Sequence, residues 1–472
     1  MSSGSQHQPA SHEIGQAHRA VLGSERPELG HGATPHGDEH RFAGAGPAHV
    51  GRHVGTKVTD SHLGAGTSRH VGKLPGDAKG CVLVRTLCDF RSECPVPQTR
   101  AMNFAFSEEQ EELRKTVRAF LDSKSPETAV REQMETEAGF DKAVWKQMGE
   151  QMGLQGLHIP EQYGGSGFGY VELGVVLEEM GRALLCAPYF ATVVLAANTL
   201  IHSGDEAAKK KYLPGIAAGE TIATLAYTEP SGKWDESGIT MQASGSGSSF
   251  TLSGTKMFVI DGHTADLIIV AAKTGKGTSL FAVDGNAAGL TRTALSTMDQ
   301  TRKQAKLEFS NTPAELIGGE GNGWKILSTV LDLAAVGLAA EQVGGAQKVL
   351  DMAVEYAKVR VQFGRPIGSF QAIKHKCADM LLEVESAKSA AYYGMWCASE
   401  MNEELPSVAS LAKAYCSEAY FHATAENIQI HGGIGFTWEH PAHLYFKRAK
   451  SSELLFGDPT YHRELLAQRI GI

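Results

Sequence analysis

The chain has 472 residues, of which 42% are hydrophobic and 21% charged, so most of it is expected to form domains with a large buried core. The formal net charge of -9 argues against a nucleic-acid binder, which would show a basic excess or stripe. No run of about 18 uninterrupted apolar residues is present, so no membrane span is expected. Seven cysteines without a CxxC pair, and a start without an apolar signal core, predict a cytoplasmic protein.

Residues 1–101 differ in composition from the rest of the chain. They hold 10 of the 19 histidines but only two of the 35 aromatic residues, and they are rich in Gly, His, Ser and Pro. Such a segment buries too little apolar surface to offset the entropy lost on ordering. We expect a disordered extension. One hypothesis is that Met102 is the true start and that the extension is not native protein.

The remaining residues predict three domains, in the order of an α+β multidomain protein. Ser107 and Gln110 have the spacing of a capping box, and helical periodicity then dominates residues 102–220. Short alternating runs punctuated by Gly, Asp and Ser predict an antiparallel β domain over residues 221–318. Helical periodicity returns in residues 319–472, where the absence of an internal repeat favours an up-down four-helix bundle. The long helices are expected at 324–361, 370–400, 406–431 and 441–455.

Six strings in this chain carry a resemblance to a known family. Together with the α–β–α order of domains, these strings closely resemble those of the flavin-dependent acyl-CoA dehydrogenases. The resemblance covers the chain from Met102 to the last residue. It extends more loosely to the actinobacterial members that act on steroids. The strings are IPEQYGG (159–165), LEEMGR (177–182), YTEPSGKWD (227–235), KMFVIDGHTADLIIVAA (256–272), RVQFGRPIGSFQ (360–371) and QIHGGIGF (429–436).

The resemblance implies FAD as cofactor. Its diphosphate needs a guanidinium or bare backbone N–H groups, which Arg360 and the pair Gly432 and Gly433 can supply. In the family these groups reach the FAD of a neighbouring subunit, so the resemblance implies a homo- or hetero-oligomer, a dimer or tetramer. The residues carried over as FAD-binding are Leu225, Tyr227, Thr228, Phe258, Ile260, Arg360, Gln362, Phe363, Gln371, Gln429, Gly432 and Gly433.

The family desaturates an acyl-CoA thioester, and a carboxylate removes the Cα proton. In most members this base is the Glu of a Y-E-G-T string, but the matching string LLFGD (454–458) places Phe456 there. Other members place it after an L-D-L string, where this chain has Ala334. Both positions therefore lack a base. The family's hydroxyl near flavin N5 is replaced by Ile260, and Trp234 replaces a serine that touches CoA.

Several interpretations follow from the missing base. We favour one subunit of a heteromeric dehydrogenase, of the kind known in actinobacterial steroid and sterol side-chain breakdown. The runner-up is a self-sufficient enzyme with a relocated carboxylate, for which Glu453, Asp458 and Glu229 are candidates. A different flavin oxidase or monooxygenase, or a non-catalytic scaffold, stays open because fold alone does not define chemistry. An electron-transfer flavoprotein is the expected acceptor.

Three histidines near the second dinucleotide string, His431, His440 and His443, raise the question of a metal. No carboxylate stands at a matched spacing, so surface or packing roles are expected and no metal site is predicted.

Overall fold

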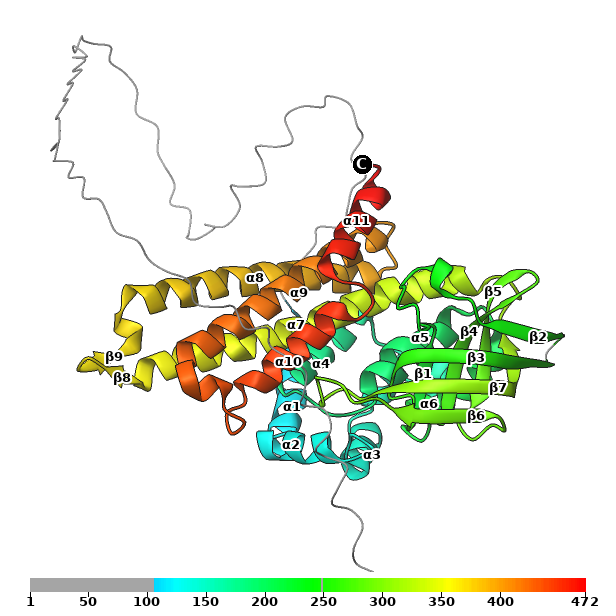
Figure 1. The fold of residues 1–472 in the computed structure, drawn as a ribbon, viewed down its shortest axis with the longest axis horizontal. Helices are drawn as coiled ribbons and strands as arrows, with labels where there is room; N and C mark the ends of the chain where they lie inside the picture. Colours follow the sequence, from blue (N-terminus) through cyan, green and yellow to red (C-terminus); the bar gives the residue numbers. More distant parts are fainter. Residues whose placement is uncertain (1–105, 248) are drawn as a thin grey trace, which may run out of the picture. The chain divides into compact units, whose positions relative to one another are not determined.

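A computed structural model describes residues 106–247 and 249–472, so the expected extension and Met102 lie outside the described residues. A helical domain, a β domain and a second helical domain follow one another, as the sequence predicted (Figure 1). The first domain consists of α1 (Glu108–Lys124), α2 (Glu127–Glu135), α3 (Lys142–Glu150), α4 (Tyr170–Arg182), α5 (Asn198–His202) and α6 (Glu206–Ala217), with the short turns η2 (Leu154–Gly156) and η3 (Glu161–Tyr163) and the π-helix η4 (Phe190–Ala197).

The predicted capping box at the start of α1 is confirmed. The backbone N–H of Gln110 donates to Ser107 Oγ at 3.2 Å, and the backbone N–H of Ser107 donates to Gln110 Oε1 at 2.9 Å. Within the region of expected helical periodicity, Phe190–Ala197 form the π-helix η4, and all eight residues are buried. A π-helix is rare and is frequently found at functional sites. It begins here with Phe190, a residue of the candidate site.

The β domain is one seven-stranded sheet followed along the chain by the second helical domain. Most of its ladders are antiparallel, as expected, but β1 pairs with β4 in parallel, so the sheet is mixed. The register of β3 against β7 shifts between Lys256 and Val259, which marks a bulge. The strands are β1 (Ala223–Ala226), β2 (Gln242–Ser246), β3 (Ser249–Ile260), β4 (Leu267–Thr274), β5 (Gly277–Asp284), β6 (Leu290–Ala294) and β7 (Gln304–Ile317), with the turn η5 (Glu236–Gly238).

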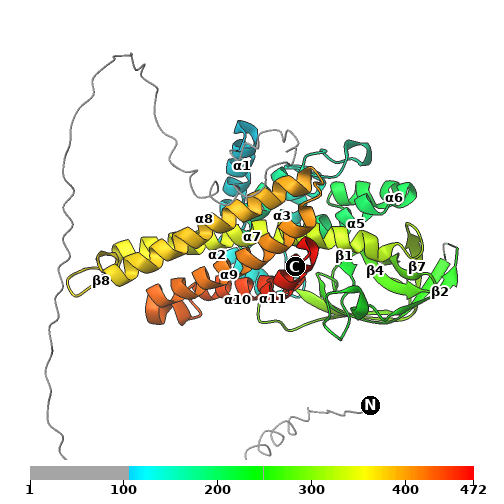
Figure 2. The same cartoon turned by 90° about the horizontal axis from the view of Figure 1, so that it is seen from above.

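The C-terminal domain contains the four predicted helices within about two residues of their expected ends, and a further short helix. Seen from above, α7 runs from beside the sheet to the hairpin of β8 and β9, and α8 runs back from the hairpin alongside α7 (Figure 2). The elements are α7 (Gly323–Val359), β8 (Val361–Gln362), β9 (Arg365–Pro366), η6 (Ile367–Ser369), α8 (Gln371–Ser399), α9 (Leu405–His431), η7 (Gly432–Phe436), α10 (Ala442–Leu454) and α11 (Pro459–Ile470).

Helix α7 is the central element of the molecule. It is long and apolar enough to cross a membrane by length and composition, but 83% of its most apolar window is buried inside the protein, as in a core helix. Helices α7 and α4 cross so closely that their backbones are almost in contact. A Cβ added to Gly344 would lie 1.8 Å from the Glu178 carbonyl oxygen, and one added to Gly181 would lie 1.9 Å from that of Glu341.

A buried group of charges joins all three domains around Glu341 of α7. Its carboxylate accepts from Arg302, in the loop before β7, and from Arg448 of α10 at 2.8 Å. Arg448 also donates to the Thr301 carbonyl at 3.0 Å and to the Leu185 carbonyl at 3.5 Å. Burial opposes ionisation of Glu341, but the two arginines outweigh it and hold the pKa of this carboxyl below its usual value.

Candidate functional site

The bulge in β3 aims one aromatic side chain outward. Phe258 has a φ of 58°, a left-handed conformation that costs a non-glycine residue energy, and its side chain is half-exposed. It lines a cleft of about 320 Å³ between the β domain and α10. The cleft offers a largely apolar surface to a flat ring. Its lining residues are Trp234, Phe258, Thr297, Met298, Asp299, Gln304, Ser451, Leu454 and Leu455.

The other predicted flavin residues of the β domain are buried. Leu225, Tyr227, Thr228 and Ile260 are each at most 5% exposed. The Ile260 carbonyl accepts from the Thr224 hydroxyl at 2.6 Å, so this group already has a partner inside the protein. The structure thus brings these four residues together behind Phe258 without exposing them.

Aromatic rings fill the position that the resemblance assigns to the base. The Phe456 ring stacks on Phe190 at 5.9 Å between centroids, and Trp234 meets Phe456 edge-on at 6.3 Å. Tyr227 lies 6.2 Å from Trp234 in the same cluster. Ala334, the second base position, is fully buried. Neither position carries a proton acceptor.

A small cavity remains behind this aromatic cluster. Its volume is about 20 Å³, which is room for one water molecule and not for an acyl chain. Phe190, Ile260, Asp261, Arg302 and Glu341 are among the residues that line it.

Three carboxylates were considered as relocated bases: Glu229, Glu453 and Asp458. None of them lines the Phe258 cleft or the small cavity. Glu229 accepts from Lys256 Nζ at 2.8 Å and from two backbone N–H groups. Burial opposes its ionisation, but Lys256 outweighs burial and lowers its pKa. Asp458 caps α11 by accepting from the Tyr461 N–H at 2.8 Å, and Glu453 pairs with Lys450 at 2.9 Å. Each carboxylate therefore has a structural partner.

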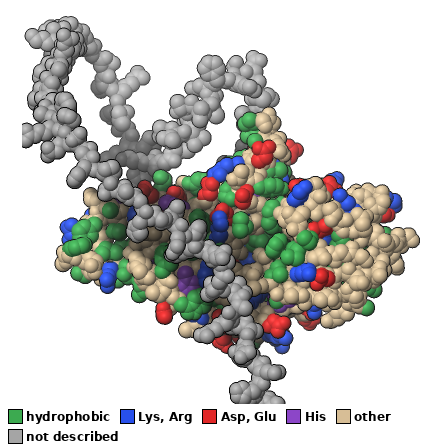
Figure 3. Space-filling model, viewed as in Figure 1, with side chains coloured by type: hydrophobic (Ala, Val, Ile, Leu, Met, Phe, Trp, Pro, Cys, Tyr) green, Lys and Arg blue, Asp and Glu red, His purple; other side chains and the backbone are tan. Residues whose placement is uncertain are grey.

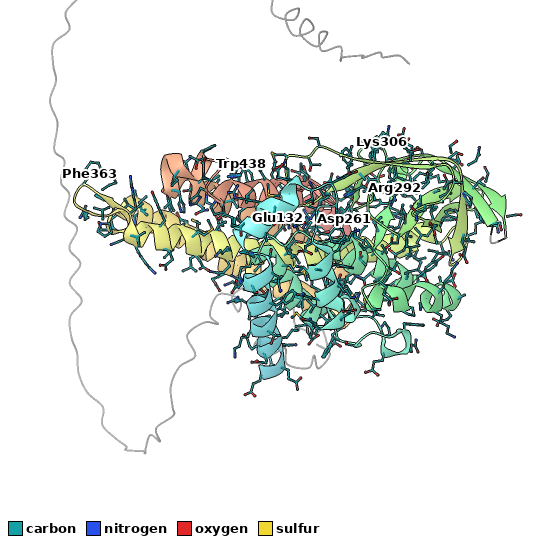
Figure 4. All side chains as sticks on the ribbon, turned by 90° about the horizontal axis from the view of Figure 1, so that it is seen from below. Glu132, Asp261, Arg292, Lys306, Phe363 and Trp438 are labelled. Carbon is teal, nitrogen blue, oxygen red and sulfur yellow. The ribbon has the colours of Figure 1, made fainter. Side chains whose placement is uncertain are left out.

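Sequence reasoning missed Asp261, a buried carboxylate that lines the small cavity. Asp261 directly follows β3 and is the neighbour of Ile260, a predicted flavin-binding residue. This position in the chain was the only sequence signal that it belongs to the site. Burial raises the pKa of Asp261 to about 7, although Arg302 and Arg448 act in the opposite direction. Figure 4 shows Asp261 near the junction of the sheet and the helices. A carboxyl with this pKa can hold or release a proton near neutral pH.

The Asp261→Asn variant is expected to be more stable than wild type by about 2–4 kcal/mol at pH 8 and nearly unchanged at pH 4. Between the unfolded pKa near 3.9 and the folded pKa of about 7, the folded state holds a proton that the unfolded state has lost, so stability falls as pH rises. Asparagine keeps the shape and tolerates the φ of 51°.

Urea unfolding of Asp261→Asn at both pH values measures the effect, with Asp379→Asn on the exposed face of α8 as the control. An equal gain at the two pH values would show that the carboxyl does not titrate between them.

The remaining predicted cofactor residues belong to the C-terminal domain, toward the end of the helical bundle that is far from the sheet. Arg360, Gln362 and Phe363 lie on the exposed β8–β9 hairpin, and Gln371 starts α8. Phe363 is 92% exposed and marks the tip of the hairpin in Figure 4. Apolar side chains are visible at this end in the space-filling view (Figure 3).

Gln429 lies on the exposed side near the end of α9, and the two glycines follow it. Gly432 has a φ of 66°, and no heavy atom lies within 4 Å of a Cβ built on Gly432 or Gly433. A ligand can therefore approach this backbone closely, as a diphosphate requires. Together with the Arg360 guanidinium, these groups fit the diphosphate of FAD, and the Phe258 cleft fits its flat ring.

The hairpin residues lie far from the sheet of the same chain. Helix α7 begins beside the sheet and ends at the hairpin, and its 37 residues span roughly 55 Å. Gln429 lies nearer to the β domain, because Met298 lines both the Phe258 cleft and a groove that Gln429 lines.

Comparison with known protein families gives matches to three acyl-CoA dehydrogenase domains. The N-terminal domain of that family matches residues 107–220, its middle domain matches residues 224–312, and its C-terminal domain matches residues 321–471. The chain is 37% identical to "Acyl-CoA dehydrogenase IpdE2" of Mycolicibacterium smegmatis over 353 residues, 75% of this chain and 96% of the relative.

Two solved structures are also similar to the chain. One is a variant of the Tcur3481–Tcur3483 steroid ACAD, with 30% identity, a TM-score of 0.71, and coverage of 77% of this chain and 98% of that one. The other is from the ChsE4–ChsE5 complex of Mycobacterium tuberculosis, with 29% identity, a TM-score of 0.72, and coverage of 78% and 99%. The resemblance seen in the sequence is confirmed: the chain is a member of the acyl-CoA dehydrogenase family, FAD-dependent oxidoreductases that act on CH–CH bonds.

Proposed function

We propose that this chain is the base-lacking subunit of a heteromeric acyl-CoA dehydrogenase. The observation that carries the proposal is the Phe456 ring, held between Phe190 and Trp234 at the position of the family's base. A phenyl ring cannot remove the Cα proton of a thioester. A partner subunit of the same fold, with glutamate at this position, would supply the base.

The bundle end of this chain would complete the FAD site of that partner. Bound FAD would accept the hydride from the substrate Cβ. Arg360 would pair with the diphosphate, and the N–H groups of Gly432 and Gly433 would donate to it. The exposed hairpin would exclude water from that contact.

The similar solved structures support this assembly. One belongs to a complex of two named chains, ChsE4 and ChsE5, and another is called a steroid ACAD. We accordingly propose a steroid-derived acyl-CoA as the substrate, bound by the partner, an electron-transfer flavoprotein as the acceptor and the cytoplasm as the location. The aromatic cluster and the cavity of about 20 Å³ are consistent with acyl binding outside this chain's own pocket.

Co-expression with a family member that carries glutamate at the Phe456 position tests the proposal. The isolated chain should hold little flavin and show little desaturase activity, whereas the complex should hold flavin and turn over acyl-CoA. Arg360→Ala in this chain should lower flavin retention at least tenfold without preventing assembly, because it removes a charge-assisted contact to the diphosphate. Lys358→Ala, two residues away and ion-paired to Glu355, is the charge-matched control.

Full turnover by the isolated chain would overturn the heteromeric assignment. It would favour the second candidate, a self-sufficient enzyme with a relocated base. Among the described carboxylates, Asp261 then fits best, because it is buried beside Ile260 and Phe190 and has a raised pKa. In that case Asp261→Asn should abolish turnover by the isolated chain while flavin stays bound.

A further inference from the structure

Lys413, near the middle of α9, is a lysine without exposed surface. Within residues 106–247 and 249–472, none of its contacts is an ion pair with a carboxylate. Burial lowers the pKa of Lys413 to about 7, although Glu453, Cys416 and Asp458 act in the opposite direction. An ammonium group in such a place needs other strong acceptors, because burying an unpaired charge is costly.

Two of the acceptors of Lys413 are backbone carbonyls of one turn. Its Nζ atom donates to the Glu453 carbonyl at 3.0 Å and to the Gly457 carbonyl at 3.1 Å, and its third contact is Ser417 Oγ at 3.0 Å. Helix α10 ends at Leu454, so the Glu453 carbonyl belongs to its last turn, which lacks intrahelical partners and carries partial negative charge. Lys413 therefore ties the end of α10 to the segment that leads into α11. We call this segment, residues 453–457, the α10–α11 turn.

The α10–α11 turn contains a strained residue. Phe456 has a φ of 62°, and Gly457 follows it with a φ of 110°. A left-handed φ costs a phenylalanine free energy, so it persists only where surrounding groups hold it. His462 gives a second support, because its Nε2 atom lies 3.2 Å from the Phe456 carbonyl oxygen. Burial lowers the pKa of His462 to about 3, so its ring is neutral near pH 7 and donates through Nε2.

The same turn carries the side chain at the family's base position. The Phe456 ring lies 5.9 Å from the Phe190 ring and 6.3 Å from the Trp234 ring, between centroids. The main chain of the turn sets the direction of the Cα–Cβ bond of Phe456, and this bond limits where the ring can lie. The two carbonyls that Lys413 binds stand on either side of Phe456 in the chain, so Lys413 acts on the ring through the backbone.

We infer that Lys413 is a positioning residue, which fixes the α10–α11 turn and thereby holds the Phe456 ring at the base position. The inference rests on the proposed function, in which position 456 is the base position and is blocked in this chain. It adds a physical cause for the block. The ring stays in place because a buried cation on α9 holds its backbone, and not through aromatic packing alone.

Fluorine NMR of the full chain, with 4-fluorophenylalanine placed only at position 456, tests this role. In the otherwise unchanged chain, the ring currents of Phe190 and Trp234 should displace the resonance from its position in the unfolded chain. Lys413→Met keeps the length and the apolar contacts of the side chain but removes its N–H donors. We expect this variant to lose at least half of that displacement or to split the resonance, because the turn can then leave its left-handed conformation.

Two control variants separate the turn contacts from the loss of a charge or of another hydrogen bond. Lys450→Met removes a lysine of α10 that pairs with the Glu453 side chain at 2.9 Å. Ser417→Ala removes the third acceptor of Lys413 and leaves both carbonyl contacts. Both variants should keep the original resonance. An unchanged resonance in Lys413→Met would overturn the inference, and so would a shift of equal size in Lys450→Met.

A milder variant serves if thermal unfolding shows that Lys413→Met does not fold. Lys413→Gln keeps an N–H donor on a shorter side chain, which cannot reach both carbonyls as the lysine does. The resonance should move in the same direction by a smaller amount. If it stayed in place, the positioning role would be wrong.

Failure of this inference is distinguishable from failure of the proposed function. The resonance is measured on the isolated chain without flavin or turnover, so an unchanged resonance in Lys413→Met would leave the heteromeric assembly intact. Full turnover by the isolated chain would overturn the assembly, whereas a displaced resonance in Lys413→Met would still show that Lys413 holds the turn.

Discussion

Gly344→Ala is expected to lower the free energy of unfolding by about 3 kcal/mol. The added methyl carbon would lie 1.8 Å from the Glu178 carbonyl oxygen and 3.0 Å from the Arg182 nitrogen. These are backbone atoms of α4, so they cannot move aside as a flexible side chain can. Helices α4 and α7 would have to separate.

A second glycine of the same helix is the control. The nearest atoms to a Cβ on Gly337 would be side-chain atoms: methyl groups of Leu177 and Val194 at 3.2 and 3.3 Å, and the Tyr170 hydroxyl at 3.8 Å. Gly337→Ala should change stability by less than about 1 kcal/mol, because the helix propensity of alanine offsets the tighter packing. Urea unfolding followed by circular dichroism measures both variants. Equal effects would show that the α4–α7 crossing relaxes easily.

Glu341→Gln is expected to cost about 3–5 kcal/mol of folding free energy. The change removes the negative charge shared by Arg302 and Arg448, both less than 10% exposed. Arg448 keeps Asp299 at 3.2 Å, whereas Arg302 stays buried without a carboxylate. A buried charge without its partner is far more costly than the pair. Because the same group of charges ties Leu185, Thr301 and α10 together, the three domains should loosen in one transition.

An exposed ion pair on the same helix is the matched comparison. Glu355 pairs with Lys358 and both side chains are more than 60% exposed. Glu355→Gln should therefore cost less than about 0.5 kcal/mol, and its effect should vanish in high salt. If Glu341→Gln and Glu355→Gln lost similar amounts of folding free energy, the charges around Glu341 would have to be accessible to water.

Local sequence signals predicted the elements that depend on local periodicity and capping. The four bundle helices and the Ser107 capping box were placed correctly, because apolar spacing and a side-chain cap are properties of neighbouring residues. The π-helix at Phe190 was not predicted, since its apolar residues follow the same pattern as an α-helix. Strand β2 carries Gly and Ser and is mostly exposed, so it had no strand signal.

The candidate site was predictable only where the resemblance supplied its residues. The substitution of both base positions was readable from the sequence as Phe456 and Ala334. What fills the space was not, because Phe190 and Trp234 reach Phe456 from distant parts of the chain. Asp261 was missed for the same reason, because its burial comes from other elements of the fold.

The length of α7 has a consequence for the proposed assembly. The helix is unbroken over 37 residues, so the hairpin at its end lies far from the sheet of its own chain. If the hairpin serves the FAD site of a neighbouring chain, two copies of this chain would form two sites without a base. In a pair of unlike chains, only the site in the glutamate-bearing β domain would be productive. For the proposed heteromer we therefore expect one active flavin for every two polypeptides, half the ratio of a dehydrogenase built from identical subunits.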